Sequence, residues 1–395
     1  MKKTLLSLFS LTLTMCLAAP TRAQNDNSKT PTLLVDDDKV QCPTASFTSI
    51  QAAVNAAQPG DMIRVCPGTY PEQVTIEKPL SILGDNGAVV IPSNVTPNAS
   101  DPSTAESIAA VIVVRNTNDV AIEGLIVDGS NNDITECGPD FIGILFQNAS
   151  GRVAHNAVRH IRLAPSLPGC QSGNAILVQS SSGGESDVEI HQNSVSDYQK
   201  NGITGDEPGT EMTVTGNVVT GIGPNASIAQ NGIQAGFGAK GSIVGNSVAG
   251  NVYSPCASVQ QCEANGTGIL VYQSDEVQVT DNSVGTNQVG IFIGGNDSRV
   301  RDNTVFNSQV LIGVAIAGDK NDVTRNEITH SDDTGVLIQG NNNQVERNRI
   351  TDAAVGILKI TGSVGNTLAG NRFFATLVPV EDPAAGKPIA VKPVR

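Results

Sequence analysis

Aromatic residues are scarce in this chain of 395 residues: tryptophan is absent, and Phe and Tyr together make up 3% of it. A conventional globular core depends on the burial of large aromatic side chains, so this composition argues against such a core. Glycine is abundant, with 40 residues spread along the chain. A solenoid of small coils stacks Val, Ile and Leu instead. Length alone suggests two or three domains, but the composition is uniform along the chain and therefore predicts a single domain.

Basic residues are also few, with 24 Lys and Arg against 38 Asp and Glu, which gives a net charge of −14. Nucleic-acid binding needs clustered cations, so the composition excludes nucleic acid as an expected partner. The same charge opposes polyanionic polysaccharides, unless a bound divalent cation or a local basic patch reverses the field. A uniformly acidic surface can equally serve solubility alone.

Long apolar runs are missing except near the N-terminus, where Lys2 and Lys3 precede an apolar segment at residues 5–19. A small residue, Ala23, then precedes Gln24. This order is typical of a cleaved signal peptide, which we expect at residues 1–23. The run is too short for a membrane span, so the sequence predicts a secreted or periplasmic protein that does not cross the membrane. A lipid anchor on Cys16 is the alternative, but Met15 stands where a small residue is wanted.

Six cysteines remain after the signal peptide, and none lies in a C-x-x-C or Cys/His cluster. An even number of cysteines in an exported protein indicates disulfides rather than metal ligands. Six cysteines allow 15 connectivities, and local spacing selects Cys42–Cys66, Cys137–Cys170 and Cys256–Cys262.

The main signal is an internal repeat. An asparagine followed two residues later by Val, Ile or Phe recurs, and from Asn282 onward the steps are 21, 23, 22 and 23 residues. The repeated asparagines are Asn156, Asn193, Asn217, Asn246, Asn282, Asn303, Asn326, Asn348 and Asn371. A Gly-Ile or Gly-Val pair runs in phase, at Gly268, Gly290, Gly313, Gly335 and Gly356. Such a fixed period indicates a solenoid.

Each period holds short β-branched segments separated by Gly, Asn and Asp turns, without the leucine spacing of leucine-rich repeats. Alternation places Ile291 and Ile293 on one face and Phe292 on the other. Strands joined by turns too short for helical crossovers predict an all-β, single-stranded parallel β-helix. We expect the repeated asparagines to form an amide ladder, each in a left-handed turn conformation.

Both ends of the solenoid need covers for their open strand edges. Phe47, Ile50 and Val54 lie on one face of a predicted capping helix at residues 47–58, which Pro59 and Gly60 end. At the other end Phe373 and Phe374 could close the core. The β-helix domain is therefore predicted at residues 24–375, followed by a proline-rich tail at residues 376–395.

The opening of the chain resembles the pectin-lyase-like superfamily. The segments that carry this resemblance are residues 47–57, Pro59-Gly60-Asp61, Gly68-Thr69-Tyr70-Pro71-Glu72 and residues 78–84. With the ladder included, the resemblance covers residues 33–375 and is strongest to right-handed parallel β-helix repeat proteins, including the NosD type. It implies a right-handed parallel β-helix, and the NosD-type members that it resembles are periplasmic. It does not imply one function, because the fold carries lyases, hydrolases, esterases, epimerases and accessory proteins.

Known motifs of that superfamily are incomplete in this chain. Gly68-x-Tyr70-x-Glu72 matches one pectin methylesterase signature, but the other esterase motifs are missing, as are the polygalacturonase and alginate epimerase motifs. For copper, the mature chain offers two methionines and four histidines without clustering. The histidines are His155, His160, His191 and His330.

The best place for a site is where the repeat widens, between Asn156 and Asn193 and between Asn217 and Asn282, because extra residues must leave the coils as loops. Alignment on the Gly-Ile word stacks outward side chains in one stripe, which would suit a sugar chain. The substrate-binding candidates are Gln147, Gln179, Asn201, Asp206, Gln234 and Tyr272, and Asn174 and Asn231 align with Asn201. The alternative interpretation of the stripe is ordinary solvated surface.

If the protein is an enzyme, which the sequence leaves open, the expected reaction is of the lyase or epimerase type. The catalytic candidates are Lys200, Asp206 and Tyr272, with proton abstraction beside a uronate carboxylate. No cofactor is required except possible Ca²⁺, for which Asp206 with Glu207 and Asp128 with Asp133 are weak candidates. The expected partner of this monomer is a polysaccharide or a cell-envelope component. A non-catalytic binding scaffold and a periplasmic metalloenzyme accessory protein are the alternatives.

Overall fold

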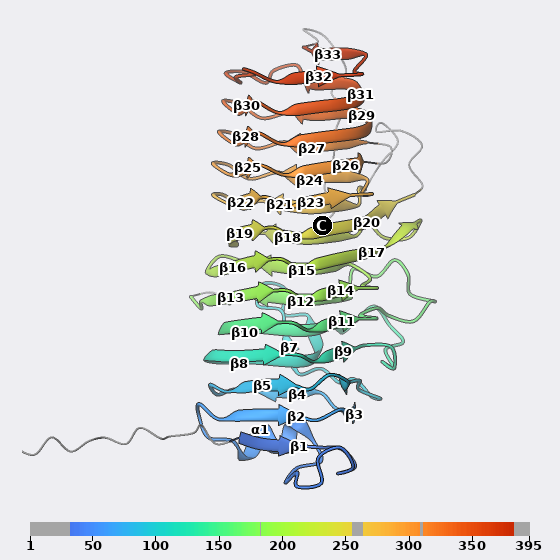
Figure 1. The fold of residues 1–395 in the computed structure, drawn as a ribbon, viewed down its shortest axis with the longest axis vertical. Helices are drawn as coiled ribbons and strands as arrows, with labels where there is room; N and C mark the ends of the chain where they lie inside the picture. The colour runs from blue at the N-terminus through green and yellow to red at the C-terminus, as the bar shows by residue number, and fades with distance from the viewer. Residues whose placement is uncertain (1–31, 182, 255–263, 309–310, 383–395) are drawn as a thin grey trace, which may run out of the picture. The chain divides into compact units, whose positions relative to one another are not determined.

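The computed structural model describes residues 32–181, 183–254, 264–308 and 311–382. These residues belong to one compact unit, in which successive coils stack into a right-handed parallel β-helix (Figure 1). The predicted fold class is confirmed. The expected signal peptide, Cys256, Cys262 and residues 383–395 lie outside the described residues, so the signal peptide and the third disulfide stay predictions. The described part of the chain has no helix of the length and apolar character needed to span a membrane.

Each coil contributes strands to three parallel columns, which follow one another along the chain. The first column is made of β1 (Thr32–Val35), β2 (Met62–Val65), β5 (Ser81–Gly84), β8 (Ser107–Glu123), β10 (Asp140–Ala154), β13 (Ser186–His191), β16 (Thr210–Thr215), β19 (Lys240–Val244), β22 (Gln278–Thr280), β25 (Arg299–Arg301), β28 (Asp322–Thr324) and β30 (Gln344–Glu346).

The second column is made of β3 (Gly68–Tyr70), β6 (Ala88–Val90), β9 (Ile126–Asp128), β11 (Ala157–Arg159), β14 (Ser194–Ser196), β17 (Val218–Asn225), β20 (Ser247–Tyr253), β23 (Ser283–Gly285), β26 (Thr304–Ser308), β29 (Glu327–Ile338), β31 (Arg349–Lys359) and β32 (Arg372–Phe374).

The third column carries the candidate site. It consists of β4 (Val74–Ile76), β12 (Asn174–Gln179), β15 (Asn201–Asp206), β18 (Asn231–Gly236), β21 (Thr267–Tyr272), β24 (Val289–Ile293), β27 (Ile312–Ile316) and β33 (Val378–Glu381). The long strands β8, β10, β29 and β31 each turn a corner and belong to this column as well as to another. The short strand β7 (Ala99–Ser100) pairs antiparallel with β8 at its side.

The Gly-Ile motif marks the residues of the third column that point into the core. Ile269, Ile291 and Val314 lie in register on successive coils and are fully buried. The preceding glycine is required by close packing: a Cβ on Gly290 would lie 2.4 Å from the Val305 Cγ1 atom and 2.5 Å from the Gly313 carbonyl oxygen. The repeat therefore marks the inward corner of each coil.

The repeated asparagines form the expected ladder. The backbone N and the Nδ2 of Asn326 donate to Oδ1 of Asn348 at 2.9 and 3.0 Å, and Nδ2 also donates to the Val300 carbonyl at 2.9 Å. Asn303 makes the same pair of bonds to Asn326, and the pattern extends from Asn156 to Asn371. Each rung thus satisfies buried backbone and amide groups that would otherwise be costly.

The conformational role expected for these asparagines is wrong. The left-handed conformation belongs to the residue before each ladder asparagine, as in Arg325 with φ 58° and Arg347 with φ 57°. The structure also has shorter ladders that we did not predict. Asn251 donates to Asn287, and backbone donors of Asn321 and Asn343 reach the next asparagine of their own stack.

The N-terminal cap is helix α1 (Ile50–Ala56), shorter than the predicted 47–58 because Ser49 is its N-cap and accepts from the Ala52 N–H at 3.1 Å. The Glu72 carboxylate accepts the Ile50 and Gln51 N–H groups at 2.7 and 2.8 Å, where the helix dipole favours negative charge. Glu72 of the G-x-Y-x-E word therefore fastens the cap to the first coil.

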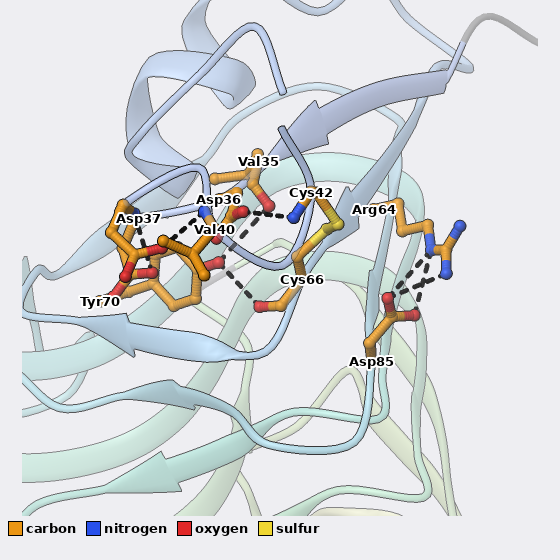
Figure 2. The surroundings of a disulfide bond; sticks show 10 residues. Val35, Asp36, Asp37, Val40, Cys42, Arg64, Cys66, Tyr70 and Asp85 are labelled. Carbon is orange, nitrogen blue, oxygen red and sulfur yellow. Dashed lines mark hydrogen bonds and ion pairs between the residues drawn. A yellow bond between two sulfur atoms is a disulfide. The ribbon is translucent and has the colours of Figure 1, made fainter. Parts of the chain in front are cut away.

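The Cys42–Cys66 disulfide lies beside this cap (Figure 2). Tyr70, the middle residue of the same word, is buried and donates to the Cys66 carbonyl at 2.7 Å. Cys137 and Cys170 form a second disulfide. Both pairs are those that the spacing predicts.

The C-terminal end differs from the prediction. β33 pairs in register with β31, with Val378 opposite Val355 and Val380 opposite Ile357. The last coil therefore extends into residues 378–381, which we expected to belong to the tail. Phe373 packs against the core, whereas Phe374 is 45% exposed, under the Arg349 guanidinium.

Candidate functional site

The predicted outward stripe exists on the third column. Gln147, Gln179 and Asp206 lie in register on three successive coils, and the next two coils supply Gly236 and Tyr272. Gly236 leaves a gap in the stripe. A Cβ at this position would lie 2.5 Å from the Asp206 Oδ1 atom, so the missing side chain gives the carboxyl group its space.

A second row runs parallel to this stripe at the other end of the same strands. Asn174, Asn201 and Asn231 are in register, and each is at least nine-tenths buried. Between the two rows, the outward position is held by Leu177, then by Thr204 and Gln234, and then by Leu270 of β21. We call the strands β12, β15, β18 and β21 the pocket coils.

These strands line a pocket of about 150 Å³, space for roughly five water molecules. Its polar lining combines three carboxyl groups, one lysine and five amides, while four larger apolar or aromatic side chains form the rest. The lining residues are Asp101, Asp140, Asp206, Lys200, Gln171, Asn174, Gln179, Asn201, Gln234, Leu177, Phe237, Leu270 and Tyr272.

A hydrogen-bonded chain of amides orders one wall of the pocket. Asn231 Nδ2 donates to Asn201 Oδ1 at 3.0 Å and to Gln234 Oε1 at 3.2 Å. Gln234 Nε2 in turn donates to Asp206 Oδ1 at 3.1 Å. The wall is therefore preorganised before any ligand binds.

Three buried polar atoms of the lining have no hydrogen-bond partner: Asp140 Oδ1, Asn174 Oδ1 and Gln179 Nε2. Gln179 is 1% exposed and Asn174 is 8% exposed. Buried polar groups are almost always paired in proteins, and leaving one unpaired costs on the order of 1–3 kcal/mol. Two acceptors and one donor thus converge on the same small cavity without partners from the protein.

The electrostatics of the pocket shift its ionisable groups. Burial raises the pKa of Asp206 to about 7, and repulsion from Glu207, Asp101 and Asp140 adds to this, while the Gln234 hydrogen bond opposes it. Burial likewise raises the pKa of Asp140 to about 6. Burial lowers the pKa of Lys200 to about 8, and the Asp206 charge opposes this shift.

Asp101 behaves differently from the other two acids of the pocket. Burial disfavours its ionised form, but donors from Thr104 and Ser103 outweigh burial and lower the pKa of its carboxyl group. It lies on the segment just after β7, beside the pocket. Asp101 therefore supplies a fixed negative charge near the two titrating acids.

Other residues close the pocket at its edges. The Tyr272 ring meets the Phe237 ring edge-on, with centroids 5.4 Å apart. Gln171 follows directly on Cys170, so the Cys137–Cys170 disulfide anchors this rim. The aromatic pair offers an apolar face opposite the carboxyl and amide groups, an arrangement that suits a ligand with both polar and apolar surfaces.

The structure separates the predicted site residues into two groups. Lys200, Asn201, Asp206 and Gln234 line the pocket together, as do Gln179 and Tyr272. Gln147 and Glu207 are not part of the lining, and the Gln147 amide donates to the Ser100 carbonyl at 2.8 Å. Asp101, Asp140, Phe237, Leu177 and Leu270 were not predicted.

The expected calcium positions have other contacts. Asp128 accepts from Arg159 Nε at 2.8 Å and lies 3.0 Å from His160 Nδ1, and Asp133 accepts the Val95 N–H at 2.9 Å. Over the described residues, groups of three potential metal ligands occur at Cys42–Cys66–Asp85 (Figure 2) and at Asp36–Asp37–Asp38. The first contains the disulfide, and in the second the Asp36 and Asp37 carboxylates already accept backbone N–H groups.

Comparison with known families and structures agrees with this architecture. The family described as "Right handed beta helix region" matches residues 142–314, and the family described as "Periplasmic copper-binding protein (NosD)" matches residues 244–386. No characterised protein sequence matches the chain.

Among solved structures, a GH136 lacto-N-biosidase from Eubacterium ramulus is similar at a TM-score of 0.56 and 11% identity, covering 88% of this chain and 68% of that one. A DFA-IIIase from Arthrobacter chlorophenolicus A6 has a TM-score of 0.49 and 16% identity, covering 86% of this chain and 88% of that one. The likeness to the lacto-N-biosidase, at 11% identity, shows the fold alone. The chain thus has a right-handed parallel β-helix fold.

Proposed function

We propose that this protein binds a neutral carbohydrate in the pocket of the third column and takes up one sugar unit there. The observation that carries the proposal is the set of unpartnered atoms: Asp140 Oδ1, Asn174 Oδ1 and Gln179 Nε2. Sugar hydroxyls donate and accept at once, so a single sugar unit could satisfy acceptors and donors that face the same small space.

The aromatic and apolar wall supports a sugar rather than a fully polar ligand. A pyranose ring has polar edges and less polar faces, and Tyr272 and Phe237 offer ring surface beside the amides. The volume of about 150 Å³ favours one unit at a chain end over the extended chain that the stripe first suggested. The lacto-N-biosidase, whose name denotes action on a carbohydrate, has a similar β-helix, which is compatible with the proposal.

Charge selects the class of sugar. The lining holds three carboxyl groups, Asp101, Asp140 and Asp206, and one cation, Lys200, so an additional carboxylate on the sugar is disfavoured. We therefore propose a neutral sugar in place of the uronate expected from the sequence. The proposal includes export of the chain, which is supported by the signal-peptide pattern and the two disulfides.

A copper-related role is less well supported by the residues. The segment that matches the copper-binding family contains one histidine, His330, no methionine, and two cysteines, Cys256 and Cys262, for which a disulfide is predicted. His330 Nε2 lies 3.2 Å from an Asp352 carboxylate oxygen, and soft metal sites need several Cys, Met or His ligands together.

The test is a glycan array that contains neutral and uronate-bearing oligosaccharides, followed by calorimetry on the best ligand. Exchange of Lys200, Asp206 and Tyr272 for Ala should abolish binding, whereas the same exchange of the exposed Lys240, Asp187 and Phe374 should leave affinity within twofold. Binding of uronates alone, or full affinity in the first variant, contradicts the proposal.

A second variant separates ligand binding from folding. Gln179→Met removes a buried donor that no protein atom uses, so the variant should melt no lower than the wild type. Its affinity should nevertheless fall about tenfold, the loss of one hydrogen bond to a ligand. Unchanged affinity would show that this atom does not meet the ligand.

A further inference from the structure

Two carboxyl groups of the pocket come from different coils and have similar supports. Asp140 begins β10, and its Oδ2 accepts from Asn174 Nδ2 at 3.2 Å, while Asp206 ends β15 and accepts from the Gln234 amide at 3.1 Å. Elsewhere on the coils, carboxylates face arginines, as Asp302 faces Arg325. Neutral donors support both acids of the pocket, with Ser172 and Gly173 beside Asn174 at Asp140 and Gln234 at Asp206, and no arginine among the described residues pairs with either.

The surroundings separate the two acids. Burial is the main cause that raises the pKa of both carboxyl groups, to about 7 for Asp206 and about 6 for Asp140, and repulsion from Glu207 and Asp101 adds to the shift of Asp206. Both acids therefore titrate close to neutral pH, and Asp206 is the one of the pair that keeps its proton to higher pH. A pair of carboxyl groups in opposite states is the equipment of acid–base hydrolysis.

We infer that the pocket hydrolyses the glycosidic bond of the bound sugar unit, with Asp206 as the acid and Asp140 as the base. This inference rests on the proposed carbohydrate binding and assigns it a reaction. The unpartnered Asp140 Oδ1 is the oxygen available to a water molecule. Asp206 Oδ1 accepts from Gln234, so the proton for the leaving oxygen is carried by Oδ2 of Asp206.

The reaction balances with water as the co-reactant. Asp206 gives its proton to the glycosidic oxygen, and the bond from the anomeric carbon to that oxygen breaks, with both electrons going to the oxygen. A water molecule bonds to the anomeric carbon as Asp140 takes its proton. The products are a sugar with a free anomeric hydroxyl and the leaving group with its own free hydroxyl. Proton exchange with solvent then returns Asp206 to the acid form and Asp140 to the base form.

The test uses the full mature chain with 4-methylumbelliferyl and 2,4-dinitrophenyl glycosides of neutral hexoses and N-acetylhexosamines. Wild-type protein should release the chromophore fastest between about pH 6 and 7, the range between the pKa values of the two acids. Asp140→Asn should lower kcat at least 100-fold with both leaving groups. Asp302→Asn, in the scaffold, should leave kcat within twofold.

The leaving group distinguishes the acid from the base. Asp206→Asn should lower kcat at least 100-fold with the methylumbelliferyl glycosides but less than tenfold with the dinitrophenyl glycosides, because dinitrophenolate leaves without a proton. Equal losses with both leaving groups would overturn the assignment of Asp206 as the acid.

Binding is measured separately, with an S-linked analogue that is not hydrolysed. Both Asn variants should bind it within about threefold of the wild type. Wild-type protein that binds the analogue but cleaves no glycoside would overturn the reaction and leave the proposed binding intact. Absence of binding and cleavage would overturn both.

Discussion

The pocket coils and the coils that follow them differ in the side chain at the outward position of the third column. In β24, β27, β29 and β31, which we call the regular coils, the outward position of the third column holds Phe292, Ala315, Leu337 and Leu358, all buried in one apolar cluster. In the two central pocket coils the same position holds Thr204 and Gln234. The fold does not require polar residues at this position, and under the proposed function they serve the ligand rather than the packing.

The asparagine ladder is common to both regions and gives the largest expected effect. Asn326→Leu removes the acceptor for two donors of Asn303 and the donor to the Val300 carbonyl. We expect the free energy of unfolding to fall by about 4 kcal/mol, read from urea denaturation. Glu327→Ala, at the exposed neighbouring position, should change it by less than about 1 kcal/mol. Ligand binding per folded molecule should persist, and its loss without destabilisation would make the ladder functional.

A polar residue placed in the regular coils should be costly. Leu337 is fully buried, and Leu337→Gln both loses apolar burial and buries an amide without a designed partner. We expect a loss of about 3 kcal/mol, measured in the same urea experiment, with ligand affinity unchanged. Stability within 1 kcal/mol of the wild type would mean that the regular coils tolerate polar residues as well as the pocket coils do, and the comparison would fail.

The sequence predicts the scaffold far more completely than the pocket. Because side chains alternate and every coil restarts at the Gly-Ile word, the register of Gln179, Asp206 and Tyr272 follows from spacing alone. Asp101 lies outside any repeat, on a segment that folds back beside β8, so no periodicity points to it. The unexpected position of Gln147 has the same cause, since its partner Ser100 belongs to that segment.

Asp140 was missed for a related reason. It stands two residues before the aligned part of β10, where the repeat carries no signal, and Asn174 reaches it only through the fold. Its raised pKa, like that of Asp206, depends on burial by walls from several coils. Repeats predict which residues share a column, whereas the depth of a pocket depends on the irregular insertions.

The pH dependence of stability should differ between the two regions. Because burial raises the pKa of Asp206 from its ordinary 3.8 to about 7, the folded state loses stability as pH rises from about 4 to 7. Asp206→Asn should therefore stabilise the protein above pH 7 and have little effect near pH 4. The shift corresponds to at most about 4 kcal/mol, and we expect about 2 because the carboxyl group is partly exposed to water.

Asp302, which lies between β25 and β26 outside the pocket, is the control with the opposite sign. Its ion pair with Arg325 lowers the pKa of the Asp302 carboxyl, so Asp302→Asn should slightly destabilise the protein at pH 7 and have no effect well below pH 4. Thermal melts of both variants from pH 2.5 to 8 measure these differences. Parallel profiles for the two variants would contradict the raised pKa of Asp206.

Gln234→Leu should have the smallest effect on the free energy of unfolding but a large effect on ligand affinity. Gln234→Leu restores to a pocket coil the apolar residue of the regular coils, in register with Leu270. It removes the bonds from Asn231 and to Asp206, but Asn231 keeps Asn201 as its acceptor. Leucine should also pack against Leu270, so we expect a change in unfolding free energy below about 1 kcal/mol.

The same substitution should weaken ligand binding. Because Asp206 loses its amide support and the pocket loses its polar wall, affinity for the glycan should fall at least tenfold in calorimetry. Loss of stability as large as that of Leu337→Gln would show that Gln234 serves the fold, and unchanged affinity would show that the polar interruption of the column has no part in binding.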